Sequence, residues 1–288
     1  MVIHELNGIV TGIAIDNTQI DYLVKDRLCK YDVNSKELID SAVVLKKEGF
    51  SRNLIGDDRQ LYVRDFFTLY VFDRLTYEKR HTVELGTDLK NDICEFQLDD
   101  NFLYASIRNG KIVKVDKKTF EIVCEQSYES ASIWSLGNYK HELIGSTVDG
   151  QVLFIDKENM GINHTLNISK QNIGSLIVNG DFLFTAGQDK AIHKISLKDR
   201  NVLIKKRSAH KRMFDCVGVY KNNLITICHP ASEICFWNTE TLELVEKIEI
   251  SLQLAGRTLI DKDKLFVTSR SINGIYEIDL KSHFESSN

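Results

Sequence analysis

The chain has 288 residues, of which 43% are hydrophobic and 27% charged, and its formal net charge is −4. This is an ordinary globular composition with enough apolar material for a sizeable core, which excludes an intrinsically disordered chain. No apolar stretch reaches the roughly 20 residues that span a bilayer, and the start, MVIHELNGIV, is unlike a signal peptide. We therefore expect a cytoplasmic protein without membrane contact, and the mildly acidic charge argues against a nucleic acid partner.

In chain order, the first predicted element is a short strand, VIHEL, at residues 2–6. A motif then recurs seven times, an alternating apolar run that ends in a small polar residue. The ending residues, 40–43 positions apart, are Asp32, Asp73, Asp116, Asp156, Ser196, Asn238 and Asp279. Such a period indicates a repeat architecture. We expect the repeated carboxylates to bind backbone amides at the corner after the strand, rather than to form one active site.

A second feature repeats with the same period, a leucine in a short apolar run ahead of each motif. Most of these runs follow a polar turn such as GDDR or LDDN, whose residues favour tight turns. The leucines are Leu23, Leu61, Leu103, Leu143, Leu183, Leu224 and Leu265. Each repeat therefore predicts four short antiparallel strands, which is the blade of a β-propeller.

The predicted fold is all-β, a seven-bladed β-propeller of four-stranded antiparallel blades formed by residues 1–288 as a single domain. The predicted blades lie at about 8–45, 49–85, 87–128, 131–169, 171–208, 212–250 and 253–281. We expect the strand at residues 2–6 to complete the last blade and close the ring, because an open sheet edge favours aggregation.

Several segments resemble the WD-repeat (WD40-like) propellers and their quinoprotein-like relatives. In STVDGQVLFID (146–156) and TAGQDKAIHKIS (185–196), Asp149 and Asp189 fall where that family places its blade aspartate. Trp237 and Asn238 resemble the Trp-Asp pair, and His210 resembles the histidine of the Gly-His pair. Only one repeat has the tryptophan, Ala231 stands where its aspartate is expected, and no single blade is expected to hold the whole His, Ser/Thr, Asp and Trp network. The resemblance implies the fold, while such propellers host scaffolds, lyases and hydrolases alike.

The sequence shows no catalytic motif, no glycine-rich phosphate loop and no paired metal-ligand spacing, so we predict no catalytic residues, no cofactor and no metal. One cluster leaves an alternative open. The sixth repeat carries His210, Cys216, Cys228, His229 and Cys235. They could bind zinc if they converged, but strand cysteines more simply fill space between blades.

The loops joining blades, and those between the second and third strands, are predicted to share one face that is rich in arginine and aromatic residues. The residues predicted to bind a partner there are Arg52, Arg64, Phe66, Phe67, Arg108, Trp134, Arg212, Phe214, Arg257 and Arg270. Arginines and aromatic rings are enriched at interaction hot spots. The alternative is a solvated rim whose arginines pair with nearby carboxylates, the candidates being Asp65, Asp92, Asp149, Asp189 and Asp215.

We therefore expect a non-catalytic protein–protein interaction scaffold or adaptor, within a multi-subunit complex, that docks an acidic or phosphorylated segment on this loop face. The alternative is a lyase-like enzyme or small-ligand binder that uses the central channel. Its candidate residues are Arg52, Lys90, Asp92, Ser132, Ser175, Asp215 and Arg257. A carboxylate of strongly raised pKa in a deep channel would favour the enzyme.

Overall fold

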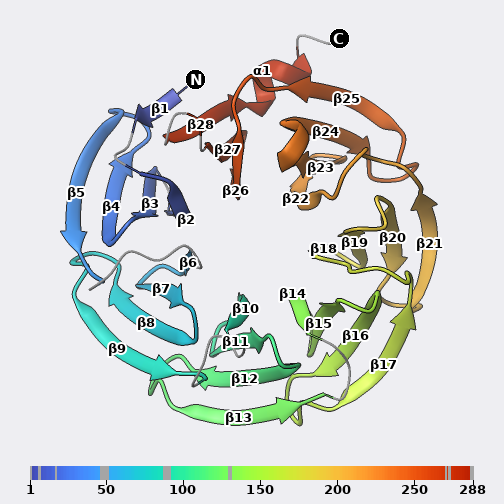
Figure 1. Cartoon of the computed structure of the whole chain (residues 1–288), viewed down its shortest axis with the longest axis horizontal. Helices are drawn as coiled ribbons and strands as arrows, with labels where there is room; N and C mark the ends of the chain where they lie inside the picture. Colours follow the sequence, from blue (N-terminus) through green and yellow to red (C-terminus); the bar gives the residue numbers. More distant parts are fainter. Residues whose placement is uncertain are drawn as a thin grey trace. The chain divides into compact units, whose positions relative to one another are not determined.

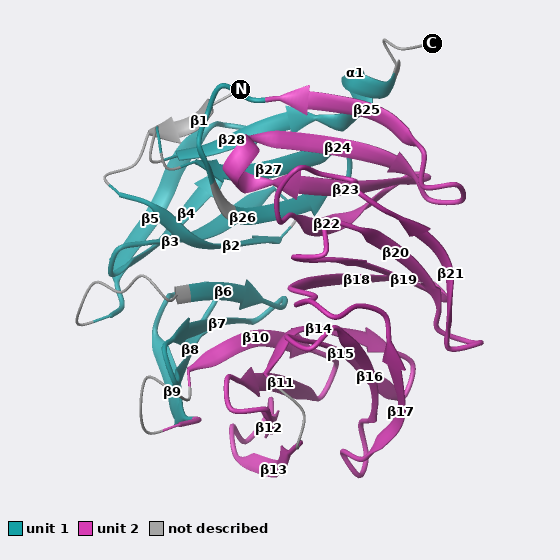
Figure 2. Ribbon diagram, turned by 45° about the vertical axis from the view of Figure 1, so that its right-hand side comes forward, with its two compact units in different colours: residues 1–84, 250–288 teal, residues 85–249 magenta. Residues whose placement is uncertain are grey.

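The computed structural model describes residues 2–5, 8–16, 18–45, 52–86, 92–128, 132–269, 271 and 274–285. These residues form seven four-stranded antiparallel sheets, the blades of an all-β, seven-bladed β-propeller, as the sequence predicts (Figure 1). The chain divides into two compact units, residues 1–84 with 250–288, and residues 85–249 (Figure 2). No helix among the described residues is long and apolar enough to cross a membrane.

The first unit holds three blades. Two of them run in chain order: β2 (Val10–Asp16), β3 (Gln19–Val24), β4 (Arg27–Asp32) and β5 (Glu37–Val43), then β6 (Arg52–Gly56), β7 (Gln60–Asp65), β8 (Thr68–Asp73) and β9 (Lys79–Glu84). The third has the spatial order β1 (Val2–Glu5), β28 (Gly274–Asp279), β27 (Lys264–Ser269) and β26 (Leu254–Asp261), followed by α1 (Leu280–Glu285). The N-terminal strand thus completes the last blade, as predicted, although Leu6 lies outside the described residues.

The second unit holds four blades, each in chain order. The first two are β10 (Ile93–Leu98), β11 (Phe102–Ile107), β12 (Lys111–Asp116) and β13 (Ile122–Ser127), then β14 (Ile133–Tyr139), β15 (Glu142–Thr147), β16 (Gln151–Asp156) and β17 (Ile162–Asn167). The next blade consists of β18 (Ser175–Asn179), β19 (Phe182–Ala186), β20 (Ile192–Ser196) and β21 (Asn201–Lys206). The last consists of β22 (Asp215–Tyr220), β23 (Asn223–Cys228), β24 (Glu233–Asn238) and β25 (Leu244–Glu249), with a short 3₁₀ turn at His229–Ala231.

Each blade has two ends. Its first and third turns lie at one end, which we call the AB/CD end, and the turn between its second and third strands lies at the other, the BC end. This follows from the antiparallel order of the strands. The loops that lead from one blade to the next also reach the BC end, so the residues predicted to bind a partner belong there.

Burial increases from the outer strand of a blade toward its middle strands. Four consecutive residues of β12 are buried, Ile112 to Val115, whereas β13 is largely exposed. Alternation of apolar and polar residues in KIVKVD predicts one buried and one more exposed side for this strand; instead, both sides are buried. The enclosed residues include a polar one, Lys114, which is 8% exposed.

The first strands of neighbouring blades lie very close together where β2 meets β6 in the first unit. A Cβ atom at Gly12 would overlap the backbone nitrogen of Leu54 and the Leu54 side chain. Glycine is needed at this position because it alone lets the two backbones approach. The packing around this contact includes Leu23, Leu54 and Leu61, all fully buried.

The repeated aspartates bind backbone amides at the corner after the third strand, which confirms the prediction. Asp73 Oδ1 accepts the N–H groups of Leu75 and Thr76 at 3.0 and 2.9 Å. The same pair of bonds recurs at Asp32, Asp116, Asp156, Asn238 and Asp279. The amide of Thr76 and then the guanidinium of Arg80 lower the pKa of Asp73 to about 2. Backbone donors likewise lower the pKa of Asp32, Asp116 and Asp156.

These corners predict an acid-sensitive fold. A carboxyl whose pKa is lower in the folded than in the unfolded chain stabilises the fold above its unfolded pKa, and this stabilisation disappears as the pH falls through the folded pKa. For Asp73 that interval runs from the ordinary value of 3.8 down to about 2. We expect the free energy of unfolding, measured by urea denaturation, to fall across this interval. Asp73→Asn keeps the amide-binding oxygen, so it should flatten the decline; an unchanged slope would contradict the assignment.

Candidate functional site

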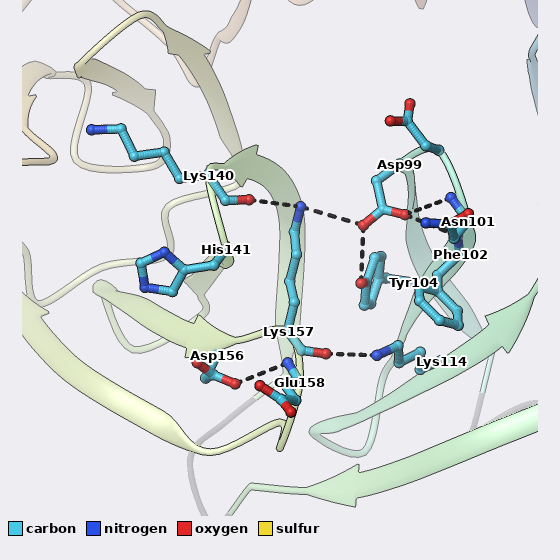
Figure 3. Close-up of a pocket in the computed structure, with 11 residues that line it drawn as sticks. Asp99, Asn101, Phe102, Tyr104, Lys114, Lys140, His141, Asp156, Lys157 and Glu158 are labelled. Atoms are coloured by element: carbon cyan, nitrogen blue, oxygen red, sulfur yellow. Dashed lines mark hydrogen bonds and ion pairs between the residues drawn. The ribbon is translucent and has the colours of Figure 1, made fainter.

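An open pocket of about 690 Å³ lies at the AB/CD end of the second unit, between the β10–β13 blade and the β14–β17 blade (Figure 3). Charged groups surround two aromatic rings in it. The lining residues are Asp99, Asp100, Asn101, Phe102, Tyr104, Lys114, Lys140, His141, Asp156, Lys157 and Glu158. Both blades therefore contribute to one site.

Asp99, in the turn between β10 and β11, is a fixed anion on one wall. Its Oδ1 accepts the N–H groups of Asn101 and Phe102 at 3.1 and 2.9 Å, and its Oδ2 accepts the Tyr104 hydroxyl at 3.0 Å. Burial acts to raise the pKa of Asp99, but these donors and the nearby Lys157 together hold it below its usual value. Asp99 is therefore ionised at neutral pH and unsuited to act as a general acid.

Lys157 crosses the pocket from the opposite wall (Figure 3). Its Nζ lies 3.4 Å from Asp99 Oδ2 and donates to the Lys140 carbonyl at 3.3 Å. This ion pair ties the corner of one blade to the first turn of the other. The charge of Lys157 is therefore matched within the pocket, and that of Lys140 is matched outside the lining by Asp181, 3.3 Å from its Nζ.

Lys114, on β12, is different. It is 8% exposed, its Nζ donates to the Lys157 carbonyl at 2.6 Å, and the same Nζ lies 4.0 Å from the centre of the Phe102 ring. Its charge contributes to the lowered pKa of Asp156. Among the described residues no carboxylate forms an ion pair with Lys114, whose ammonium group contacts the Lys157 carbonyl and the rings of Phe102 and Tyr104.

Two other blades carry a buried lysine at the same place, two residues before the corner residue. Lys194 Nζ pairs with Glu240 of the next blade at 2.9 Å. Lys30 Nζ donates to the Arg74 carbonyl at 3.0 Å and lies near the buried Asp21. The full column across the seven blades is Lys30, Val71, Lys114, Phe154, Lys194, Phe236 and Glu277. This alternation of lysine and apolar residues is present in the seven motifs, but we did not predict a site from it.

The residues predicted to bind a partner on the BC loop face have several different environments. Arg108 is bound by both oxygens of Asp92 and lies 5.3 Å from the Trp134 ring, so this arginine is paired within the protein. Arg257 Nε donates to the Thr11 carbonyl at 2.8 Å. Arg212 is exposed beside Met213, which is 49% exposed.

The remaining members of that set are less accessible or are not described. Arg64 and Phe214 are 7% and 1% exposed, and the Phe214 ring packs 4.4 Å from that of His210. Phe66 and Phe67 are half-buried in the turn between β7 and β8. Arg270 and the side chain of Arg52 lie outside the described residues. For Phe214, just before β22, and Arg64, near the end of β7, the sequence could not reveal burial, because a place at the BC end does not fix the direction of a side chain.

In the sixth repeat, the histidine, threonine and tryptophan of the WD-repeat network meet in one blade, but a glutamate takes the part of the aspartate. His210 Nε2 lies 2.8 Å from Thr226 Oγ1, which also accepts the indole N–H of Trp237 at 2.8 Å. The carboxylate is Glu233, 3.5 Å from His210 Nδ1, in place of the aspartate expected at Ala231. Glutamate has a longer side chain than aspartate, and from position 233, two residues after Ala231, it reaches His210.

The cysteines of this repeat are buried in the same core. Cys216, Cys228 and Cys235 pack with Phe184 and Trp237. Burial raises the pKa of Cys235 to about 12, so its thiol is protonated at neutral pH. Potential metal-ligand atoms of His210, Cys228 and Glu233 lie within 4.8 Å of one another, but hydrogen bonding to Thr226 and Glu233 already uses both ring nitrogens of His210.

The residues named above as candidates for an active site in the central channel form local contacts. Asp92 binds Arg108, and Asp215 lies 3.1 Å from His229 Nε2. Ser132 donates to the Arg108 carbonyl, and Ser175 donates to the Cys216 carbonyl at 3.1 Å. Lys90 lies outside the described residues. These contacts bring together no nucleophile with a general base in the described part of the chain.

The seven four-stranded blades define a WD40-like β-propeller fold. The chain is similar to the WD40 β-propeller domain of Doa1, with a TM-score of 0.77 and 12% identity over 94% of this chain and 93% of that one. It is also similar to the computationally designed Ika8 protein, with a TM-score of 0.76 and 11% identity over 96% and 98% of the two chains. No family model and no curated protein matches the sequence. At such identities the likeness is one of fold.

Proposed function

We propose that the protein is a non-catalytic interaction scaffold that holds a segment of a protein partner in the pocket between the β10–β13 and β14–β17 blades. The observation that carries this proposal is the open cavity of about 690 Å³ lined by aromatic rings and charged side chains from two blades. WD40-like propellers generally mediate protein interactions, which agrees with a role as an interaction scaffold.

The electrostatics of the pocket favour docking over catalysis. Both Asp99 and Asp156 have a lowered pKa, so neither carboxyl is prepared to give or take a proton near neutral pH. The rings of Phe102 and Tyr104 and the lysine side chains provide apolar surface next to charged groups. That combination suits an extended peptide, whose backbone and side chains need both kinds of contact.

The test is to obstruct the pocket with His141→Trp, at an exposed turn position that lines it. Asn222→Trp is a matched control, because YKHE at 139–142 and YKNN at 220–223 are equivalent turns, and each turn residue accepts a backbone bond from its own corner, Lys157 or Thr239. Both variants and Arg212→Glu are compared with the wild type by quantitative co-purification from native lysate.

We expect His141→Trp to retain less than about a tenth of the partner, while the two other variants retain it, a loss that corresponds to roughly 1.4 kcal/mol or more. Circular dichroism would establish that all variants are folded. Loss with Arg212→Glu alone would place docking on the BC loop face and reject the pocket. If the wild type retains no protein, the scaffold proposal itself is wrong.

A further inference from the structure

We infer that the partner segment held in this pocket contributes a carboxylate side chain, aspartate or glutamate, which pairs with the ammonium group of Lys114. This inference rests on the proposed function, since it names the chemistry of the occupant. It starts from the buried ammonium group of Lys114, which forms no ion pair with a carboxylate among the described residues.

A buried ammonium is costly unless an opposite charge compensates for the water it has lost. An ammonium has three donors, and Lys114 uses one for the Lys157 carbonyl. The Phe102 ring, 4.0 Å away, stabilises the cation without neutralising it. Two donors therefore remain for a ligand in the cavity that Lys114 lines.

The equivalent lysine of another blade shows what such a ligand does. Lys194 is 3% exposed, stacks on Phe182 at 4.3 Å and pairs with Glu240 at 2.9 Å. Glu240 stands two residues after its corner residue, and Glu158 holds that position in the blade facing Lys114. Glu158 is exposed and forms no ion pair with Lys114, so the place that Glu240 fills beside Lys194 is open here.

A single carboxylate fits the charge of the pocket better than a phosphate does. Lys157 is paired with Asp99 and Lys140 with Asp181, which leaves Lys114 as the lysine of the pocket lining without a carboxylate partner among the described residues. Asp99, Asp156 and Glu158 line the same cavity and would repel a second negative charge. Because Lys114 alone among these lysines lacks a carboxylate partner and fixed carboxylates surround it, the pocket favours a ligand group with one negative charge over a group with two.

The probe is a fluorescein-labelled peptide selected from a random twelve-residue phage library on the wild-type protein, with His141→Trp used to remove phage that bind elsewhere. Three versions of the peptide are measured by fluorescence anisotropy. One keeps its Asp or Glu, one has the corresponding Asn or Gln, and one has phosphoserine there. We expect the amide version to bind the wild type at least tenfold more weakly and the phosphoserine version no more tightly than the carboxylate version.

A double-mutant cycle assigns the contact to Lys114. With Lys114→Met, the carboxylate and amide peptides should bind equally, whereas Lys194→Met, which removes the equivalent but already paired lysine, should leave the tenfold difference intact. Glu158→Gln should strengthen binding of the carboxylate peptide severalfold, because it removes a competing anion. The peptide substitution alone tests the inference on the unaltered protein, whatever the stability of the variants.

Two results would overturn the inference. Selected peptides that His141→Trp excludes, but whose affinity is indifferent to carboxylate replacement, would leave the pocket as a docking site with a different occupant. Tighter binding of the phosphoserine version would assign phosphate instead. Failure to select any peptide that His141→Trp excludes would count against the proposed function as well, so the two failures are distinguishable.

Discussion

Replacement of Asp21 by alanine is expected to lower the free energy of unfolding by about 3–5 kcal/mol, the range typical for breaking a buried ion pair on one side. Asp21 is fully buried on β3; its Oδ2 lies 2.8 Å from Arg74 Nε, and its Oδ1 accepts the Tyr77 hydroxyl at 2.7 Å. The alanine variant would leave the cations of Arg74 and Lys30 enclosed between two blades without their anion. Urea denaturation measures the loss.

The double substitution Asp21→Leu with Arg74→Met separates charge from packing. It removes the anion together with its principal cation, so we expect it to recover much of the stability lost by Asp21→Ala. The Tyr77 hydroxyl still loses its partner, which costs about 1–3 kcal/mol. A loss below about 1 kcal/mol for the single variant would show that water reaches this cluster and that its burial contributes little.

The Thr226→Val substitution is expected to cost about 2–4 kcal/mol, because two buried partners would lose their hydrogen bond at once. Thr226 Oγ1 accepts the Trp237 indole N–H and bonds to His210 Nε2, both at 2.8 Å. Valine has nearly the same shape, so packing in the blade should be preserved.

Thr185→Val is the matched control in the neighbouring blade. Thr185 Oγ1 makes one such bond, to His193 Nδ1 at 3.1 Å, and is equally buried. We therefore expect about half the loss found for Thr226→Val, measured by urea denaturation of both variants. Equal losses would mean that the network in the sixth repeat adds nothing beyond a single buried threonine bond.

The architecture could be predicted from the sequence because each blade repeats the same physical requirements. The corner residue must offer an oxygen to two amides, so Asp73 and Asp156 recur in register with Asn238. The same regularity located the N-terminal strand in the last blade. Periodic positions carry this information because every repeat meets an equivalent neighbour.

The site was harder to predict because it depends on what each blade packs against. Lys114 stands in an alternating run, a pattern typical of a half-exposed strand, yet it is buried and contacts the next blade. Whether such a lysine finds a carboxylate depends on a turn some forty residues later, as Glu240 and Glu158 show. Likewise, Glu233 replaced the expected aspartate because its length, and not its position in the motif, lets it reach His210.

The pairing of β1 with β28 has a consequence for synthesis of the protein. Val2 is paired in register with Tyr276, so β1 is synthesised long before the strand with which it pairs. At about 5–20 residues per second this delay is on the order of 15–60 s. Until β28 has been made, β1 therefore lacks its native partner, and its unpaired edge is open to pairing with another chain.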